Sequence, residues 1–442
     1  MRRLGLIQGM PAFITMWSGQ FLSLVGSEMT AFGLGVYVYR QTGSATQFAL
    51  ITLFIFVPQI LATVLAGVWA DRYDRRHLLI IINVAATVAS VILVAIVTAG
   101  ALNVWIVYVM TFLFAICNAT QFPPFAASVP LLVPKQHLGR ANGMVQFALV
   151  TSWFLAPVLA ASLLSVIGLR AIVAIDLVTF LVAIATLLLI DIPQPAPTGQ
   201  RRSVLNEAVE GWRYILARPG LVGLLLFFAV ANVDAGLRTS LATPMVLSFA
   251  STLSLGLIAS AGGAAVILGS ILMIVWGGPK RRMKLVLLAG MVFGAFTSLL
   301  GLAPSVPLIA VATFGLSFCL PLINAANAAI WQATVPSGMQ GRVMATVRMV
   351  AWSTVPIVAV VAGPLADHVF NPLLAADGAL AGSVGRVIGT GPGRGIGFMF
   401  LLAGLIPIVA GVLAMLSRPV RTVEDEGPSP VRQEQAVSTS AS

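Results

Sequence analysis

Long apolar runs, each separated from the next by a short polar segment, dominate this chain. A helix that crosses a bilayer needs about 20 mostly apolar residues, and the chain offers twelve such runs. In the first half they are Phe13–Val38, Gln47–Trp69, Leu78–Ala99, Trp105–Ala127, Gly143–Ile167 and Ala171–Ile190. In the second half they are Leu221–Met245, Leu253–Val275, Leu285–Leu302, Pro307–Ile330, Ala345–Leu365 and Ile396–Leu416. The pattern predicts an all-α membrane protein with twelve transmembrane helices.

Composition narrows the class of protein further. Of the 442 residues 59% are hydrophobic and only 9% are charged, whereas an ordinary soluble domain has about 25% charged residues. A water-soluble fold of this length cannot hide so much apolar surface. A soluble enzyme, a coiled coil and a disordered regulator are therefore excluded, and the lipid bilayer is the expected surrounding of most of the chain.

The net charge of +11 comes from basic clusters between the apolar runs. Lysine and arginine collect in cytoplasmic loops of membrane proteins. Roughly 20 of the 25 fall in the even-numbered connections and at the two chain ends, and the exceptions outside the spans are Arg40, Arg170, Arg386 and Arg394. We therefore expect both termini in the cytoplasm and the protein in an inner or plasma membrane. No basic and aromatic surface for nucleic acid is present.

The second half of the sequence repeats the first. A shift of 202 residues superimposes Val133-Pro134 and Gly139-Arg140 on Val335-Pro336 and Gly341-Arg342, and Cys117 on Cys319. The repeat predicts two pseudo-symmetric six-helix bundles, at 1–192 and 221–417. Between them we expect a cytoplasmic linker with an amphipathic helix at 193–220, and after them a disordered cytoplasmic tail at 418–442. Duplicated halves of this kind serve alternating access in transporters, with a site at the repeat interface.

The connection between the second and third spans carries the most informative motif. Its residues Gly67, Asp71, Arg72, Arg75 and Arg76 fit the spacing G-x-x-x-D-R-x-x-R-R and resemble a signature of the major facilitator superfamily. The resemblance implies that this loop is a conformational gate, in which an aspartate among arginines locks the cytoplasmic helix ends. An ordinary basic loop explains the arginines but not the spacing of Gly67 and Asp71.

Other segments resemble the drug:proton antiporter-3 branch of that family, which includes macrolide-efflux and enterobactin-exporter proteins. They are Gly26-Ser27-Glu28, Thr42-Gly43-Ser44-Ala45, Pro123-Pro124, Arg140-Ala141-Asn142-Gly143, Asp176-Leu177-Val178-Thr179-Phe180 and Gly363-Pro364-Leu365-Ala366-Asp367. The fourth span lacks the arginine of many related antiporters, and the Gly-Pro motif of the fifth is reduced to Ala156-Pro157. The first departure fits this branch, whereas the second weakens the case for antiport.

Charged residues inside the spans are the candidates for chemistry, since each costs at least about 2.5–3.5 kcal/mol near a helix centre. Glu28 is the only carboxylate of the first span and is expected to carry a proton or contact the substrate. Asp234 and Arg238 stand four residues apart, so they face one side of a helix and can pair, either for function or as a neutralised structural pair. Arg238 is also expected to reach across to Glu28. For Asp176 a structural role is the better interpretation.

Polar amides follow helical spacing in the fourth and tenth spans, at Asn118 and Gln121 and at Asn324 and Asn327. Such side chains either line an aqueous cavity or hold neighbouring helices together. The two cysteines and three histidines form no metal-ligand spacing, and no phosphate-binding loop of the form G-x-x-x-x-G-K-[ST] occurs. We expect no catalytic residue, no metal and no cofactor.

Together these features predict a secondary active transporter that functions as a monomer. The resemblance implies export of an amphipathic small molecule, such as a drug, a macrolide-like compound or a siderophore, in exchange for protons. An importer or facilitator of the same fold is the first alternative, because the residues do not fix direction. A membrane-embedded enzyme would need a nucleophile–base or metal constellation, and a non-transporting receptor or scaffold would leave the gate motif without a purpose.

Overall fold

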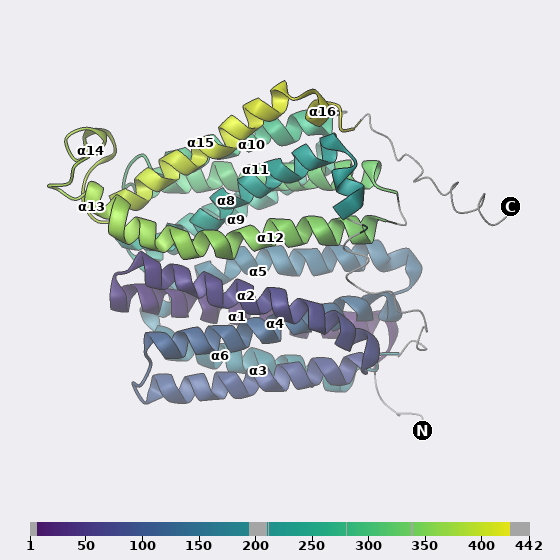
Figure 1. The fold of residues 1–442 in the computed structure, drawn as a ribbon. Helices are drawn as coiled ribbons and strands as arrows, with labels where there is room; N and C mark the ends of the chain where they lie inside the picture. Colours follow the sequence, from purple (N-terminus) through teal and green to yellow (C-terminus); the bar gives the residue numbers. More distant parts are fainter. Residues whose placement is uncertain (1–6, 194–209, 211, 280, 337–338, 425–442) are drawn as a thin grey trace, which may run out of the picture.

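The computed structural model describes residues 7–193, 210, 212–279, 281–336 and 339–424, with 63–72, 135, 139, 340–342, 345, 348 and 352 described by their backbone alone. Within those residues the architecture is almost wholly helical (Figure 1). The described part contains twelve helices long and apolar enough to cross a membrane. The predicted all-α fold with twelve spans is thereby confirmed.

The helices form two sets. The first set is α1 (Gly9–Thr42), α2 (Ala45–Arg72), α3 (Arg75–Thr98), α4 (Val104–Leu132), α5 (Leu138–Val166) and α6 (Gly168–Leu189). The second set is α8 (Pro219–Leu247), α9 (Thr252–Trp276), α10 (Arg282–Leu300), α11 (Val306–Thr334), α12 (Gln340–Leu365) and α15 (Arg394–Leu416). Further short elements are η1 (Lys135–His137), η2 (Ala366–Phe370), α13 (Asn371–Leu373), α14 (Val384–Ile388) and α16 (Arg418–Arg421).

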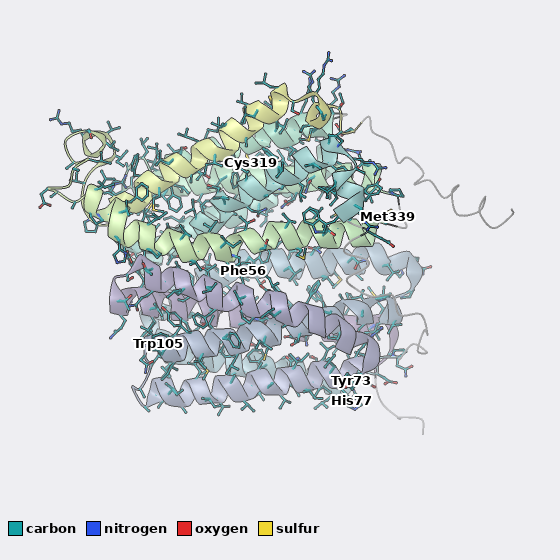
Figure 2. All side chains as sticks on the ribbon, viewed as in Figure 1. Phe56, Tyr73, His77, Trp105, Cys319 and Met339 are labelled. Carbon is teal, nitrogen blue, oxygen red and sulfur yellow. The ribbon has the colours of Figure 1, made fainter. Side chains whose placement is uncertain are left out.

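The two sets lie side by side, with α2 and α5 of the first set packed against α12 and α9 of the second (Figure 1). The spans run between two ends of the molecule, one bearing α16 and the other bearing α13 and α14. We call these ends the α16 side and the α14 side. Tyr73, His77 and Met339 lie on the α16 side, and Trp105 lies on the α14 side (Figure 2). The turn after α2 and the start of α12 therefore share the α16 side.

Helix boundaries follow the internal repeat. The helix α4 begins at Val104 and ends at Leu132, and α11 begins and ends at the positions that the 202-residue shift predicts, Val306 and Thr334. The same shift relates the first residue of α5, Leu138, to the first residue of α12, Gln340. The sequence repeat therefore coincides with a repeat of helix boundaries in the structure.

Close approach of α1 to α6 fixes how α1 is rotated. Gly19, Gly26 and Gly33 stand seven residues apart, which places them on one face of the helix because an α-helix has about 3.6 residues per turn. A Cβ at Gly26 would lie 2.9 Å from Asp176 Oδ1, and a Cβ at Gly33 would lie 2.8 Å from a Leu169 methyl carbon. Side chains on the opposite face of α1 consequently point away from α6.

Three segments differ from the sequence predictions. The motif residues Gly67–Arg72 were predicted in a loop but belong to the last turns of α2, because this stretch contains no proline that would end the helix earlier. The predicted loop Asn371–Gly395 contains the short helices α13 and α14. The third difference is that a short helix, α16, follows the last span.

The tail was predicted to be disordered from residue 418, and this is wrong for 418–424. Arg418–Arg421 form α16, and Val420 and Val423 are buried against the second set. The Glu424 carboxylate accepts hydrogen bonds from the backbone N–H groups of Arg282 and Met283, at 3.1 and 3.2 Å. A carboxylate at a helix N-terminus satisfies donors that the helix leaves unpaired, and this contact joins Glu424 to the start of α10.

The linker between the sets lies partly outside the described residues, at 194–209 and 211. Its described end is helical from Trp212 to Leu216. Tyr214 and Ile215 are buried in the second set, and the Tyr214 hydroxyl donates to the Thr334 carbonyl at 2.8 Å. The Arg218 guanidinium lies 3.8 Å from the centre of the Tyr214 ring. This segment therefore packs on α11 with its apolar face, as an amphipathic helix does.

Candidate functional site

Glu28 lies near the middle of α1 on the face turned away from α6. It stands two residues after Gly26, which is about 200° around an α-helix. Phe32, one turn further along the same face, packs against the main apolar cluster of the second set and also against a cluster of the first set that contains Ala156, Ala160 and Ile172. Glu28 is half-buried, and no hydrogen bond or ion pair to it is present among the described residues. The register of α1 therefore places Glu28 on the side of the helix opposite Gly26.

Three aromatic rings continue this face toward the α16 side. Trp17 and Phe21 stack with ring centres 5.5 Å apart, and Phe21 meets Phe147 of α5 at 6.3 Å. Seven residues after Phe147, Phe154 packs against α9, with its Cβ 3.0 Å from the position of a Cβ built on Gly263. Phe147 shares that face of α5 but is 57% exposed, and a Cβ at Gly143 would meet nothing within 4 Å. The α9-facing side of α5 is uncovered near the α16 side.

Of the four predicted amides, Gln121 has a described bond across helices: its side chain donates to the side-chain oxygen of Gln20 on α1. Gln20 is itself buried. Asn118 is half-buried, Asn324 is exposed, and the side-chain oxygen of Asn327 is buried with no partner in the described part of the chain. The structure thus joins α1 and α4 through Gln20 and Gln121, and Gln20 was not among the predicted site residues.

The predicted pairing of Asp234 with Arg238 is present. The Arg238 Nε donates to Asp234 Oδ2 at 3.0 Å, and Thr297 of α10 lies 3.4 Å from the same oxygen. Asp234 is fully buried, and the Arg238 guanidinium lies 4.8 Å from the centre of the Phe293 ring, also on α10. Arg238 therefore points into the packing of the second set, which corrects the expectation that it reaches across to Glu28.

Asp176 is a second buried carboxyl near α1, and its contacts belong to the packing of the first set. The Ser27 hydroxyl donates to Asp176 Oδ1 at 3.3 Å, and the Thr179 hydroxyl lies 3.5 Å from that oxygen. Asp176 is fully buried against the glycine face of α1. Its contacts join α6 to α1, and its structural role stays a prediction.

The predicted gate motif divides into two parts. Arg76 is buried, and its Nε and Nη2 donate to the carbonyls of Leu187 and Leu188, each at 2.8 Å. These carbonyls belong to the last turn of α6, where a cation is favourable. Arg75 donates to the Ala127 carbonyl of α4 at 2.9 Å. Both arginines thus hold the first set together, while the side chains of Gly67, Asp71 and Arg72 lie outside the described residues.

On the α14 side, polar side chains join the two sets directly. Arg40 at the end of α1 hydrogen bonds to the Thr252 hydroxyl at the start of α9. Asp367 in η2 receives hydrogen bonds from the Ser44 hydroxyl at 2.7 Å and from the backbone N–H groups of Ala45 and Thr46 at 3.1 and 2.9 Å. The first set and the second set are therefore tied together at this side.

Several residues of the site escaped sequence analysis for identifiable reasons. Trp17 and Phe21 carry the i, i+4 spacing of a helix face, but apolar residues fill every span and the spacing alone does not distinguish them. Gln20 could have been identified as a candidate from the sequence, because it is a polar residue inside an apolar run. Asp367 is the last residue of a segment that was noted only for its resemblance to the antiporter branch. Its role escaped sequence analysis because its hydrogen-bond partners lie more than 300 residues away in the chain.

Comparison with protein families gives one match that covers most of the chain: a sequence model described as Major Facilitator Superfamily matches residues 16–360. Among named relatives, macrolide efflux protein A of Streptococcus pyogenes is 25% identical over 428 residues, which cover 93% of this chain and 97% of the relative. The multidrug efflux pump Tap of Mycobacterium tuberculosis is 26% identical over 375 residues, covering 78% of this chain and 87% of the pump.

Solved structures share the fold at low sequence identity. A bacterial homologue of the human lysosomal transporter Spinster, in an inward-facing and unoccupied conformation, aligns with a TM-score of 0.67 and 15% identity over 95% of this chain and 98% of its own. The nucleoside transporter NupG aligns with a TM-score of 0.71 and 9% identity over 91% and 99% of the two chains.

Proposed function

Because this chain belongs to the major facilitator superfamily, a family of membrane transporters rather than enzymes, we propose that it exports an amphipathic small molecule in exchange for protons. The relatives named for macrolide efflux and multidrug efflux support the direction and the class of substrate. In this proposal the two sets of helices rock against each other around a site near the middle of the bilayer.

The observation that carries the proposal is the face of α1 that bears Trp17, Phe21, Glu28 and Phe32. Glu28 has no described partner on that face, and the stacked rings offer apolar surface beside it. Aromatic faces and a carboxylate together suit an amphipathic ligand with a basic group. We therefore propose that such a ligand and a proton compete for Glu28, while Asn118, Gln121, Asn324 and Asn327 supply polar contacts.

Proton antiport predicts that purified protein in liposomes concentrates its substrate when the pH differs across the membrane. A radiolabelled macrolide and a fluorescent cationic dye are suitable probes. Accumulation should follow the sign of the pH difference and should vanish when a protonophore dissipates it, because the proton gradient is the only source of energy. Uptake that equilibrates but never exceeds the outer concentration, at any pH difference, would favour a facilitator of the same fold instead.

The sidedness of the chain is a separate prediction. We propose that the α16 side is cytoplasmic, because basic residues collect there, and that the uncovered face of α5 makes this an inward-facing conformation. Single cysteines at Ser203 and Ser383, introduced after Cys117 and Cys319 are replaced by alanine, should react with a membrane-impermeant maleimide from opposite sides. In intact cells we expect labelling at 383 and none at 203 until the membrane is permeabilised. Labelling of both positions from one side would refute the arrangement.

A further inference from the structure

Asp367 occupies an unusual position, because it belongs to the second set and caps a helix of the first. The first N–H groups of an α-helix have no partner within the helix, and α2 begins at Ala45. Ser44 provides the local cap, since its hydroxyl oxygen accepts from the Gln47 N–H at 3.2 Å. The Asp367 carboxylate accepts from the Ala45 and Thr46 N–H groups and from the Ser44 hydroxyl. The N-terminus of α2 is therefore completed from the other set.

Local backbone features bring Asp367 to this place. Gly43 has a φ of +63° and ends α1, so the chain turns at once into α2. On the other set, Gly363 lets α12 approach the start of α2, because a Cβ there would lie 2.5 Å from Thr46 Cα. Beyond Gly363 the helix widens into the five-residue π-helix η2, which contains Asp367. Such π-segments occur frequently at functional sites.

The sequence around Asp367 reappears at the other end of the same pair of helices. The segment Val360-Val361-Ala362-Gly363-Pro364-Leu365-Ala366-Asp367 matches Val64-Leu65-Ala66-Gly67-Val68-Trp69-Ala70-Asp71 at Val, Ala, Gly, Ala and Asp. The offset is 296 residues, not the 202 of the internal repeat, so duplication of the two halves does not account for it. It relates the end of α12 on the α14 side to the end of α2 on the α16 side, and these two helices pack against each other.

We infer that Asp367 is a latch that holds the α14 side of the transporter closed. The carboxylate binds the N-terminus of α2 in the observed conformation and must leave it when the two sets separate on that side. The segment that ends in Asp71 stands at the opposite end of the pair, where α12 begins. The helices α2 and α12 thus carry the same motif at their C-terminal ends. The latch at Asp367 favours the conformation in which the α14 side is closed.

The inference rests on the alternating access of the proposed function but is tested without substrate or proton. Spin labels on Ala101→Cys and Ala376→Cys report the separation of the sets on the α14 side, and labels on Tyr73→Cys and Lys284→Cys report it on the α16 side. All four side chains are exposed, and Cys117→Ala and Cys319→Ala remove the native thiols. Distance distributions are measured by double electron–electron resonance in detergent and in lipid nanodiscs.

Asp367→Ala should lengthen the distance on the α14 side and shorten it on the α16 side. Loss of charge-assisted hydrogen bonds at a helix N-terminus should shift the ratio of the two conformations by at least about tenfold. Gly363→Ala, which keeps the carboxylate but pushes α12 from α2, should shift both distances in the same direction. Asp71→Asn should leave the α14 side closed.

Asp377→Ala is the matched control, since Asp377 is an exposed carboxylate ten residues away and its removal should change neither distance. The inference is overturned if Asp367→Ala and Gly363→Ala, each eluting as folded monodisperse protein, give the same two distance distributions as the parent. It is also overturned if Asp377→Ala shifts the distances as much as Asp367→Ala, because general charge in the loop would then explain the effect. Failure of substrate transport in liposomes leaves these distances unaffected and bears on the proposed function alone.

Discussion

Glu28→Gln should abolish the accumulation of substrate driven by a pH difference while leaving exchange of substrate across the membrane intact. Glutamine preserves the size and the hydrogen-bonding capacity of the side chain but can neither bind nor release a proton. If Glu28 carries the proton, the variant is locked in one charge state, and the flux of substrate loses its coupling to the proton gradient. Glu28→Asp retains a titratable group and should keep part of the activity.

The measurement uses one set of liposomes for two assays. Accumulation is followed after a pH jump, and exchange is followed with equal substrate concentrations and no pH difference. Asp176→Asn is the matched control: that carboxyl is buried between α1 and α6 and hydrogen bonded to Ser27, so its neutralisation should lower the yield of folded protein but not the coupling per folded molecule. If Glu28→Gln protein still concentrates substrate in response to pH alone, Glu28 is not the coupling residue and Asp234 becomes the next candidate.

The contrast between Glu28 and Asp176 also illustrates how far sequence alone reaches. Hydropathy predicts all twelve spans, because the cost of exposing polar groups to lipid depends on composition and length rather than on partners. The repeat predicts even the boundaries of α11 from those of α4. Whether a buried carboxyl faces a neighbouring helix or the space between the sets depends on helix rotation. That rotation is set here by the close contact of Gly26 with α6.

Arg76 and Asp367 also show that sequence alone does not predict contacts between distant elements. Arg76 stands in a motif that resembles a gate, yet in this conformation it binds two carbonyls at the end of α6. Asp367 stands at the end of an apolar span, where sequence gives no partner, yet it caps α2 from the other set. Spacing along a chain identifies which residues share a helix face, whereas contacts between elements hundreds of residues apart depend on packing that no local pattern encodes.

The pair formed by Asp234 and Arg238 should prove to be a structural element of the second set. Asp234→Ala is expected to destabilise the protein by about 3–5 kcal/mol, because it leaves Arg238 without the carboxylate that neutralises it in a largely buried position. The loss should appear as a lower melting temperature and a smaller yield of monodisperse protein. Thr297→Val is the milder comparison, since it removes a 3.4 Å contact to the same oxygen and leaves the ion pair in place.

The double variant Asp234→Leu with Arg238→Met separates structure from function. Replacing a buried ion pair by apolar side chains of similar size is often neutral or stabilising, so the double variant should recover most of the stability lost in Asp234→Ala. Because both side chains point toward α10 rather than toward Glu28, it should also transport substrate in response to a pH difference. A double variant that is as stable as the parent but does not respond to pH would instead place the pair in the coupling mechanism.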